Sequence, residues 1–249
     1  MVVDIADQDS YIHYIERLAK SLTVLQNIED RELFFTAQDI PFYHFLDCTD
    51  LLFFKLYVWN DVQNKEHFPF KDFCDRLDKT RILPIYKQMS QAYLSIPSKE
   101  IWTNQTVDTI LRLLDFYVEM GAFDSKETVL LLLNQLSRLL DTIHTYAENG
   151  CKGQTEKTPF DLYLCSVDLE NNFMLTRRGD RLACTIKLYT VNSIVTDNIE
   201  LCRESEKWIN DLILKSTLIS GTSVKERFRF FQTSKNKIES LIDKIETMK

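Results

Sequence analysis

The chain contains very little glycine and proline, with five residues of each among 249. Glycine adopts positive φ angles most readily, so a chain with few glycines forms few tight turns. All-β sandwiches and propellers need many such turns, whereas long helices need few connections. The composition therefore predicts a mainly α-helical chain. Its apolar share of 45% is ordinary for a globular protein with a buried core.

Several long segments carry apolar residues at helical spacing. The clearest runs from Ser125, a suitable N-cap residue, to Glu148 and carries a broad stripe of leucines. Further helices are expected at 10–25, 39–59, 105–120, 197–219 and 224–248, with a brief helical turn at 98–102. The segment 42–59 is apolar nearly all round, which is typical of a central, buried helix.

Residues 160–191 follow a different pattern. Apolar and polar side chains alternate in three short runs, and turn residues such as Gly179 separate the runs. This period of two predicts a small antiparallel β-meander. The expected fold is therefore mainly α, a helical bundle or irregular helical array with a β-meander inserted near residues 160–191. A polar loop at 149–159 divides an all-helical part, 1–150, from a part at 160–249 with the meander and two long C-terminal helices; the two can also form one continuous domain.

The sequence lacks the common local signatures of catalysis. Its five glycines form neither a dinucleotide-binding nor a Walker A loop, and zinc-protease and nucleophile-elbow motifs are absent. His44 and Cys48 stand four residues apart, but a zinc site needs about four ligands and no second pair is available. We therefore expect no metal, no cofactor and no assigned catalytic residue. An enzyme whose active site has no local motif stays open, although the balance favours a protein that is not an enzyme.

Charge and cysteine usage bear on the compartment. The formal net charge is −7, and the six cysteines include no C-x-x-C pair. The N-terminal ten residues lack the basic and apolar regions of a signal peptide, and no apolar run reaches the roughly 18 residues of a membrane span. These features predict a cytoplasmic protein with reduced, mostly buried thiols and no membrane contact.

Two local groups of basic residues stand out against the acidic background. One lies at the tight turn of the expected meander, and the other interleaves with phenylalanines near the C-terminus. Their members are Arg177, Arg178 and Arg181, and Lys225, Arg227, Arg229, Lys235 and Lys237. A basic hairpin after helices resembles, in shape alone, the wing of a winged-helix module. Cations among aromatic residues also suit nucleic-acid phosphates and bases.

The C-terminal helix carries an apolar stripe that must be buried against something. We expect its first half, with Val224, Phe228 and Phe231, to pack on the chain's own core. The end beyond Lys235 is expected to dock a partner protein or a second copy through four apolar residues. These are Ile238, Leu241, Ile245 and Met248.

The first functional hypothesis is a binding or adaptor subunit of a larger complex, acting through an aromatic-rich helical surface and this helix. The alternatives are a nucleic-acid-associated protein that uses the two basic groups, and an enzyme without a local motif.

Overall fold

The computed structural model describes residues 8–47, 52, 56, 59, 70–76, 79–153, 157–169, 172–187 and 193–247. The helices are α1 (Gln8–Gln26), the 3₁₀ helix η1 (Phe42–Asp47), α3 (Phe70–Arg76), α4 (Lys79–Leu94), α5 (Thr106–Glu119), α6 (Lys126–Asn149), α7 (Ile199–Leu214) and α8 (Val224–Thr247). The strands are β1 (Arg31–Ala37), β2 (Ser98–Thr103), β3 (Cys151–Lys152), β4 (Thr158–Cys165), β5 (Asn172–Arg178), β6 (Arg181–Lys187), β7 (Ser193–Thr196) and β8 (Thr217–Leu218).

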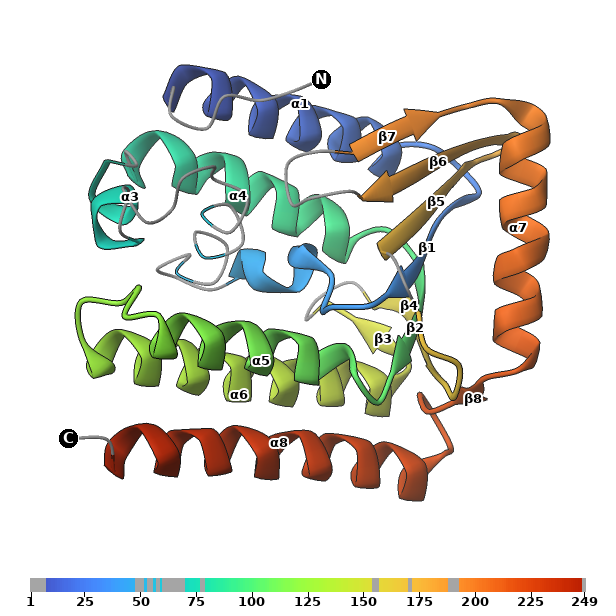
Figure 1. The fold of residues 1–249 in the computed structure, drawn as a ribbon. Helices are drawn as coiled ribbons and strands as arrows, with labels where there is room; N and C mark the ends of the chain where they lie inside the picture. The colour runs from blue at the N-terminus through green and yellow to red at the C-terminus, as the bar shows by residue number, and fades with distance from the viewer. Residues whose placement is uncertain are drawn as a thin grey trace.

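A mixed sheet runs through the centre of the molecule (Figure 1). Its described strands follow the order β3-β4-β2-β1-β5-β6-β7, with β8 paired to β4. β1, β2 and β4 are parallel, and the helices that connect them provide the crossovers that parallel pairing requires. β5, β6 and β7 continue the sheet as an antiparallel meander. The prediction of a mainly α fold with a small meander is therefore wrong, because this is an α/β fold.

Two central strands, β1 and β2, lie within the residues expected to be all-helical. They pair with β5 and β4 from the later part of the chain, so strands from both sides of residue 150 share one sheet. The expected helical turn at 98–102 is instead strand β2. The alternating runs do form strands, at 158–165, 172–178 and 181–187, but β4 pairs with β2 and β8 rather than with β5. Pairing with a distant strand therefore replaced the expected hairpin between the first two runs, whereas the hairpin of β5 and β6 at Gly179 formed as the spacing predicted.

The sheet separates two layers of helices (Figure 1). α1, α4, α5, α6 and α8 lie on one side, which we call the bundle face, and α7 covers the other, the α7 face. Alternate residues of β1 serve the two sides. Leu33 and Phe35 join the large core under the bundle, while Phe34 joins a smaller core under α7. This alternation is the ordinary consequence of a strand's period of two. Among the described helices, none combines the length and apolar character needed to cross a bilayer.

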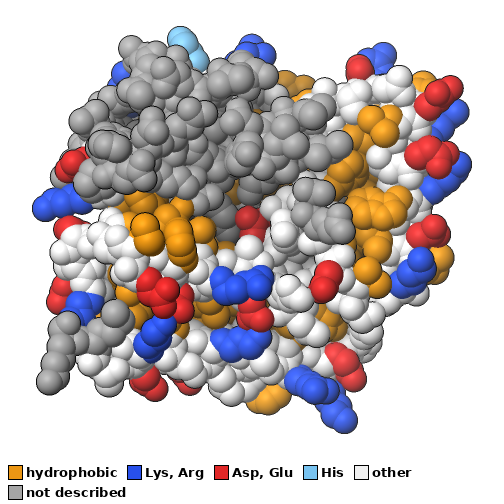
Figure 2. All heavy atoms as spheres, in the orientation of Figure 1, with side chains coloured by type: hydrophobic (Ala, Val, Ile, Leu, Met, Phe, Trp, Pro, Cys, Tyr) orange, Lys and Arg blue, Asp and Glu red, His pale blue; other side chains and the backbone are white. Residues whose placement is uncertain are grey.

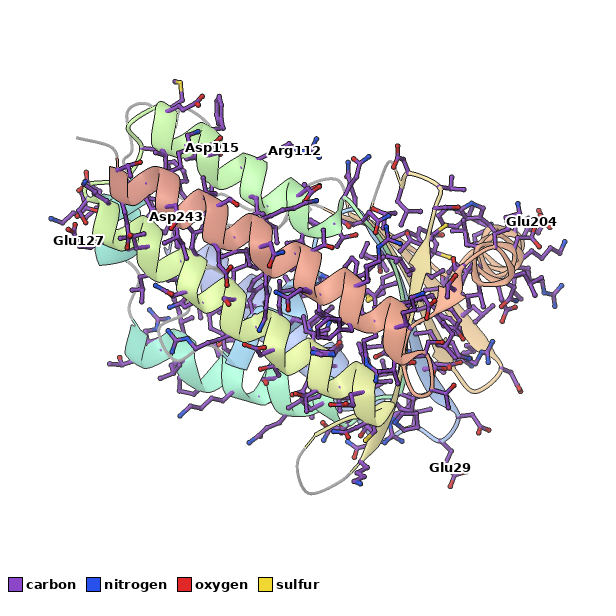
Figure 3. All side chains as sticks on the ribbon, turned by 90° about the horizontal axis from the view of Figure 1, so that it is seen from below. Glu29, Arg112, Asp115, Glu127, Glu204 and Asp243 are labelled. Carbon is purple, nitrogen blue, oxygen red and sulfur yellow. The ribbon has the colours of Figure 1, made fainter. Side chains whose placement is uncertain are left out.

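The helix α8 lies along α5 and α6, as Figure 3 shows with Asp115 marked on α5. Three of its four lysines pair with acidic residues on those two helices. Lys237 Nζ lies 2.7 Å from an oxygen of Asp108, and Lys244 Nζ lies 2.6 Å from Asp115. Lys235, which falls within the apolar stripe, reaches Asp141 of α6. The basic charge of this helix is thus largely met by acids of the same chain.

The buried face of α8 differs from the predicted one in its first half. Phe230 and Phe231 are buried, whereas Phe228 is 59% exposed. Arg227 occupies the buried side instead, where its guanidinium donates to the carbonyl oxygens of Ile219 and Gly221. An arginine that bonds backbone carbonyls can therefore take a position that the sequence pattern assigns to an apolar residue.

The buried Phe230 and the exposed Phe228 provide a matched test of how α8 is oriented. Replacing Phe230 by alanine removes a buried ring from between the sheet and α8, and we expect a loss of about 3–5 kcal/mol in the free energy of unfolding. The same change at the exposed Phe228 should cost no more than about 0.5 kcal/mol. Urea denaturation of both variants measures the difference. Equal losses would contradict the assigned orientation of α8.

Candidate functional site

A buried carboxylate on β2 organises the most polar part of the interior. Glu100 has no exposed surface, and its side chain points to the bundle face. His44 Nε2 lies 3.0 and 2.9 Å from its two oxygens, the Tyr93 hydroxyl donates to it at 2.6 Å, and Trp102 Nε1 donates at 2.9 Å. A carboxylate only accepts hydrogen bonds, so the imidazole presents Nε2–H to it. Elements η1, α4 and β2 therefore meet at one carboxyl group.

A buried lysine completes this cluster from β3. Lys152 has no exposed surface, and its Nζ donates to Ser98 Oγ at 2.9 Å. The same ammonium lies 3.5 Å from the centroid of the Tyr93 ring, which places it over the π face. We call His44, Tyr93, Ser98, Glu100, Trp102 and Lys152 the Glu100 network.

Burial and neighbouring charge act in opposite directions within the Glu100 network. Burial lowers the pKa of Lys152 to about 7, although the charge of Glu100 opposes this shift. Burial alone would raise the pKa of Glu100, but His44, Tyr93 and Lys152 together bring it below its ordinary value. The pKa of Tyr93 is raised well above its ordinary value by burial and then by Glu100. Glu100 therefore stays ionised, and the neighbouring donors stabilise its charge.

A lysine of lowered pKa beside a serine hydroxyl is an arrangement that some hydrolases use for nucleophilic attack. Here every member of the Glu100 network is at most 5% exposed. A substrate would therefore have no contact with Ser98 Oγ or Lys152 Nζ. The network's evident role is to hold η1, α4, β2 and β3 together, and it connects through η1 to a space that a ligand can enter.

That space is an apolar pocket of about 200 Å³ between α1 and the bundle face of the meander. Its floor is formed by residues of β1, β5, β6 and β7, and its wall by leucines of α1. The floor includes Phe35, Met174, Thr176, Ala183, Thr185 and Val195. An engineered cavity of about 150 Å³ holds benzene, so this pocket has room for a small apolar molecule or chain.

Tyr43 connects the pocket with the Glu100 network. Its ring lines the pocket and stacks on Tyr93, with ring centroids 5.3 Å apart and planes 13° apart. Its hydroxyl lies 3.9 Å from Met174 Sδ on the pocket floor. The next residue, His44, binds Glu100. The buried network thus fixes the position of one wall of the pocket.

The end of the pocket near Tyr43 is closed by a polar pair. Asn172 donates to Asp39 Oδ1 at 2.5 Å, and its own oxygen accepts from the backbone amides of Gln38 and Asp39. Both side chains line the pocket. This end lies at the carboxyl end of β1, the edge of an open α/β sheet where ligands usually bind.

The structure places the predicted basic residues in several different environments. Arg177 lies on the α7 face and pairs with Glu32 and Glu206, whereas Arg178 and Arg181 lie on the bundle face. On α8, Lys225 and Arg229 are exposed, Arg227 is buried, and Lys235 and Lys237 are paired with acids. No continuous basic surface joins the turn to the helix among these residues.

The predicted docking stripe of α8 faces the protein's own core. Ile238, Leu241 and Ile245 are buried in the cluster that includes leucines of α5 and α6. A partner would therefore have to displace α8 to contact them, and the role assigned to these three residues finds no support here; Met248 lies outside the described residues. His44 Nε2 hydrogen-bonds Glu100, and Cys48 lies outside the described residues. The described residues include no group of three metal-ligating side chains.

Sequence reasoning missed the pocket and most of the Glu100 network. Glu100 lies in the short segment 98–102, for which a helical turn was expected, and no local pattern marked it as buried. A carboxylate there marks a functional or structural polar core only once β2 is known to be central. The pocket offered no local signal, because its lining comes from six separate segments.

No protein-family model, curated protein or solved structure matches the chain. The functional argument therefore depends on the geometry of the site itself.

The buried lysine makes stability depend on pH in a defined direction. Because the pKa of Lys152 is about 7 in the folded state and about 10.5 when unfolded, the unfolded chain binds more protons between these values. Stability should therefore rise with pH, by about 1 kcal/mol between roughly pH 7.5 and 8.5. Lys152→Met should remove this rise. Equal pH dependence of the two proteins in urea denaturation would show that Lys152 keeps its ordinary pKa.

Proposed function

We propose that this protein binds a small apolar ligand in the pocket between α1 and the meander. The observation that carries the proposal is the pocket itself, an apolar space of about 200 Å³ with polar groups at its ends. Ligand sites in proteins are typically concave and mostly apolar, with a few polar groups that orient the ligand. The volume is below that of drug-sized sites, which favours a ligand with few heavy atoms.

The surroundings of the pocket support a fixed binding site rather than a gap in packing. Tyr43 is held by its stack on Tyr93, and Tyr93 is held by Glu100. On the floor, Ala183 and Thr185 belong to β6, which pairs on both sides with β5 and β7. Walls held in this way need little reordering when a ligand enters, which favours affinity.

Filling the pocket tests this function. Ala183→Phe places a ring in the pocket space, and Thr185→Leu fills it less severely. With 1-octanol as the probe, we expect saturable binding at one site in calorimetry or NMR titration, and at least about tenfold weaker binding by the filled variants.

Val167→Phe provides the matched control, because Val167 is exposed and lies outside the pocket lining. This variant should bind the probe as the parent does. Absence of saturable binding to the parent protein, or equal binding by all the variants, would refute a ligand site in the pocket.

An apolar patch beside α7 favours a second function, that of an adaptor which binds another protein. Leu201 and Trp208 lie seven residues apart on α7 and are exposed, and the Trp208 ring meets Phe173 of β5 edge to face at 5.7 Å. Figure 2 shows apolar side chains gathered beside α7, in the right half of the view. Exposed tryptophans with apolar neighbours are frequent anchors of protein interfaces. This patch replaces the C-terminal stripe as the proposed docking surface.

Substitution on α7 tests the adaptor function. Proteins that co-purify with the native chain in fixed ratio should be lost from Leu201→Asp with Trp208→Ala, because these changes remove the anchor. They should remain with Glu204→Ala and Lys207→Ala, which remove a charged pair from the same helix. Native mass spectrometry compares the complexes, and complexes unchanged by the apolar substitutions would exclude this surface.

We also propose a cytoplasmic location for the protein. The support is that Cys165, Cys184 and Cys202 are free thiols buried in the core between the sheet and α7, as the cysteine pattern predicts for a reducing compartment.

A further inference from the structure

A row of three arginines crosses the sheet at one end of the pocket. In the strand register, Arg31 of β1 lies directly opposite Arg178 of β5, and Arg178 lies opposite Arg181 of β6. Directly opposed residues project on the same face and lie about 5 Å apart at Cβ. This is the bundle face, because Arg178 lines the pocket. Of the three, Arg178 lines the end of the pocket remote from Asp39, and Arg31 and Arg181 flank it in the strand register.

The charge of this row is not met by a carboxylate of the described chain. Arg31 donates to the carbonyl oxygens of Ile28 and Ser95, at 2.9 and 3.0 Å, and its Nε is buried without a partner. Arg178 and Arg181 form no ion pair among the described residues, and the neighbouring Asp30 and Asp180 form none with them. Arg177 is the contrast, since Glu32 and Glu206 neutralise it on the opposite face.

Side-by-side cations repel one another, and native sheets usually compensate them. An anionic group at this place would remove the repulsion and would accept the forked hydrogen bonds for which guanidinium groups are suited. The other end of the pocket holds the hydrogen-bonded pair Asn172 and Asp39, a neutral and an acidic side chain, so it offers no comparable positive charge. The two ends of the pocket therefore differ in the sign of their charge, and apolar residues such as Met174 lie between them.

We propose that the ligand is a short single-chain amphiphile with an anionic head group. This rests on the proposed ligand-binding function and names the ligand's chemical class. The head group lies at Arg178, which lines the pocket and stands opposite Arg181 in the strand register, and the chain extends along β5 toward Met174. By the scale on which about 150 Å³ holds the six carbons of benzene, 200 Å³ suits a chain of about eight carbons. A carboxylate and a phosphate share the required chemistry.

Four probes with the same eight-carbon chain separate the contributions of head and tail. Octanoate and octyl phosphate carry an anionic head, 1-octanol a neutral one and octylamine a cationic one. We expect the anionic probes to bind the parent protein at least about tenfold more tightly than octylamine, with octanol between them. Whichever of octanoate and octyl phosphate binds more tightly identifies the head group.

Charge reversal assigns the head-group site. Arg178→Glu, and separately Arg181→Glu, should weaken octanoate binding about tenfold or more and leave octanol binding within about twofold. Arg112→Glu on α5 is the matched control, because it makes the same charge change at an exposed position far from the pocket. It should leave all four affinities unchanged.

The outcomes distinguish this inference from the function on which it rests. If octanol binds and pocket-filling variants abolish its binding, but octanoate binds no better than octylamine, the anionic ligand class is wrong and the pocket function stands. Octanoate binding that Arg112→Glu weakens as much as Arg178→Glu also overturns the inference, because general charge would then explain it. If none of the four probes binds, both proposals fail.

Discussion

The carboxylate of Glu100 is the interaction on which most of this structure depends. A buried charge is costly unless it is paired and fully hydrogen-bonded, and its neighbours must all be in place for the cost to be met. Here those neighbours come from η1, α4, β2 and β3, of which η1 and β3 are about 50 residues away from Glu100 in the sequence. Replacing any donor would leave the carboxylate short of a partner. The network thus ties these elements together, and it favours one arrangement of the bundle on the sheet.

The shape of the pocket depends on this network. Tyr43 and His44 are consecutive in η1, so holding the imidazole against Glu100 also sets the Tyr43 ring against Tyr93 and Met174. The other walls are sheet and α1. A ligand site of this kind combines a rigid floor with one wall fixed by buried hydrogen bonds, which suits a small ligand that can offer only a few contacts.

The local patterns of the sequence predict the helices well and the sheet poorly. The α6 helix begins after Ser125, whose Oγ accepts from the Thr128 amide, and ends at Gly150 in the left-handed conformation, as its sequence signals indicate. Strands β1 and β2 carry no such signals. Each is short, and Glu100 in the middle of β2 reads as a surface residue. Its burial follows from distant partners, which a local pattern cannot show.

The same reason explains the errors on α8 and at the basic turn. The stripe through Phe228 and the stripe through Phe230 are both plausible from spacing, and the choice is made by Arg227 reaching the carbonyls that follow β8. At the turn, adjacent residues of β5 face opposite sides of the sheet, so Arg177 and Arg178 enter different environments. The arginine row could be recognised only after the strand register placed Arg31 beside Arg178.

The central claim is that a small chain-like ligand lies in the pocket with its head at the arginine row. Intermolecular nuclear Overhauser effects between octanoate and the methyl-labelled protein test this claim most directly. The account predicts contacts from the terminal methyl of octanoate to the Met174 methyl, with the Ala183 methyl contacted along the chain. Contacts confined to α7 or to the exposed end of α5, or none at saturating octanoate, would contradict it.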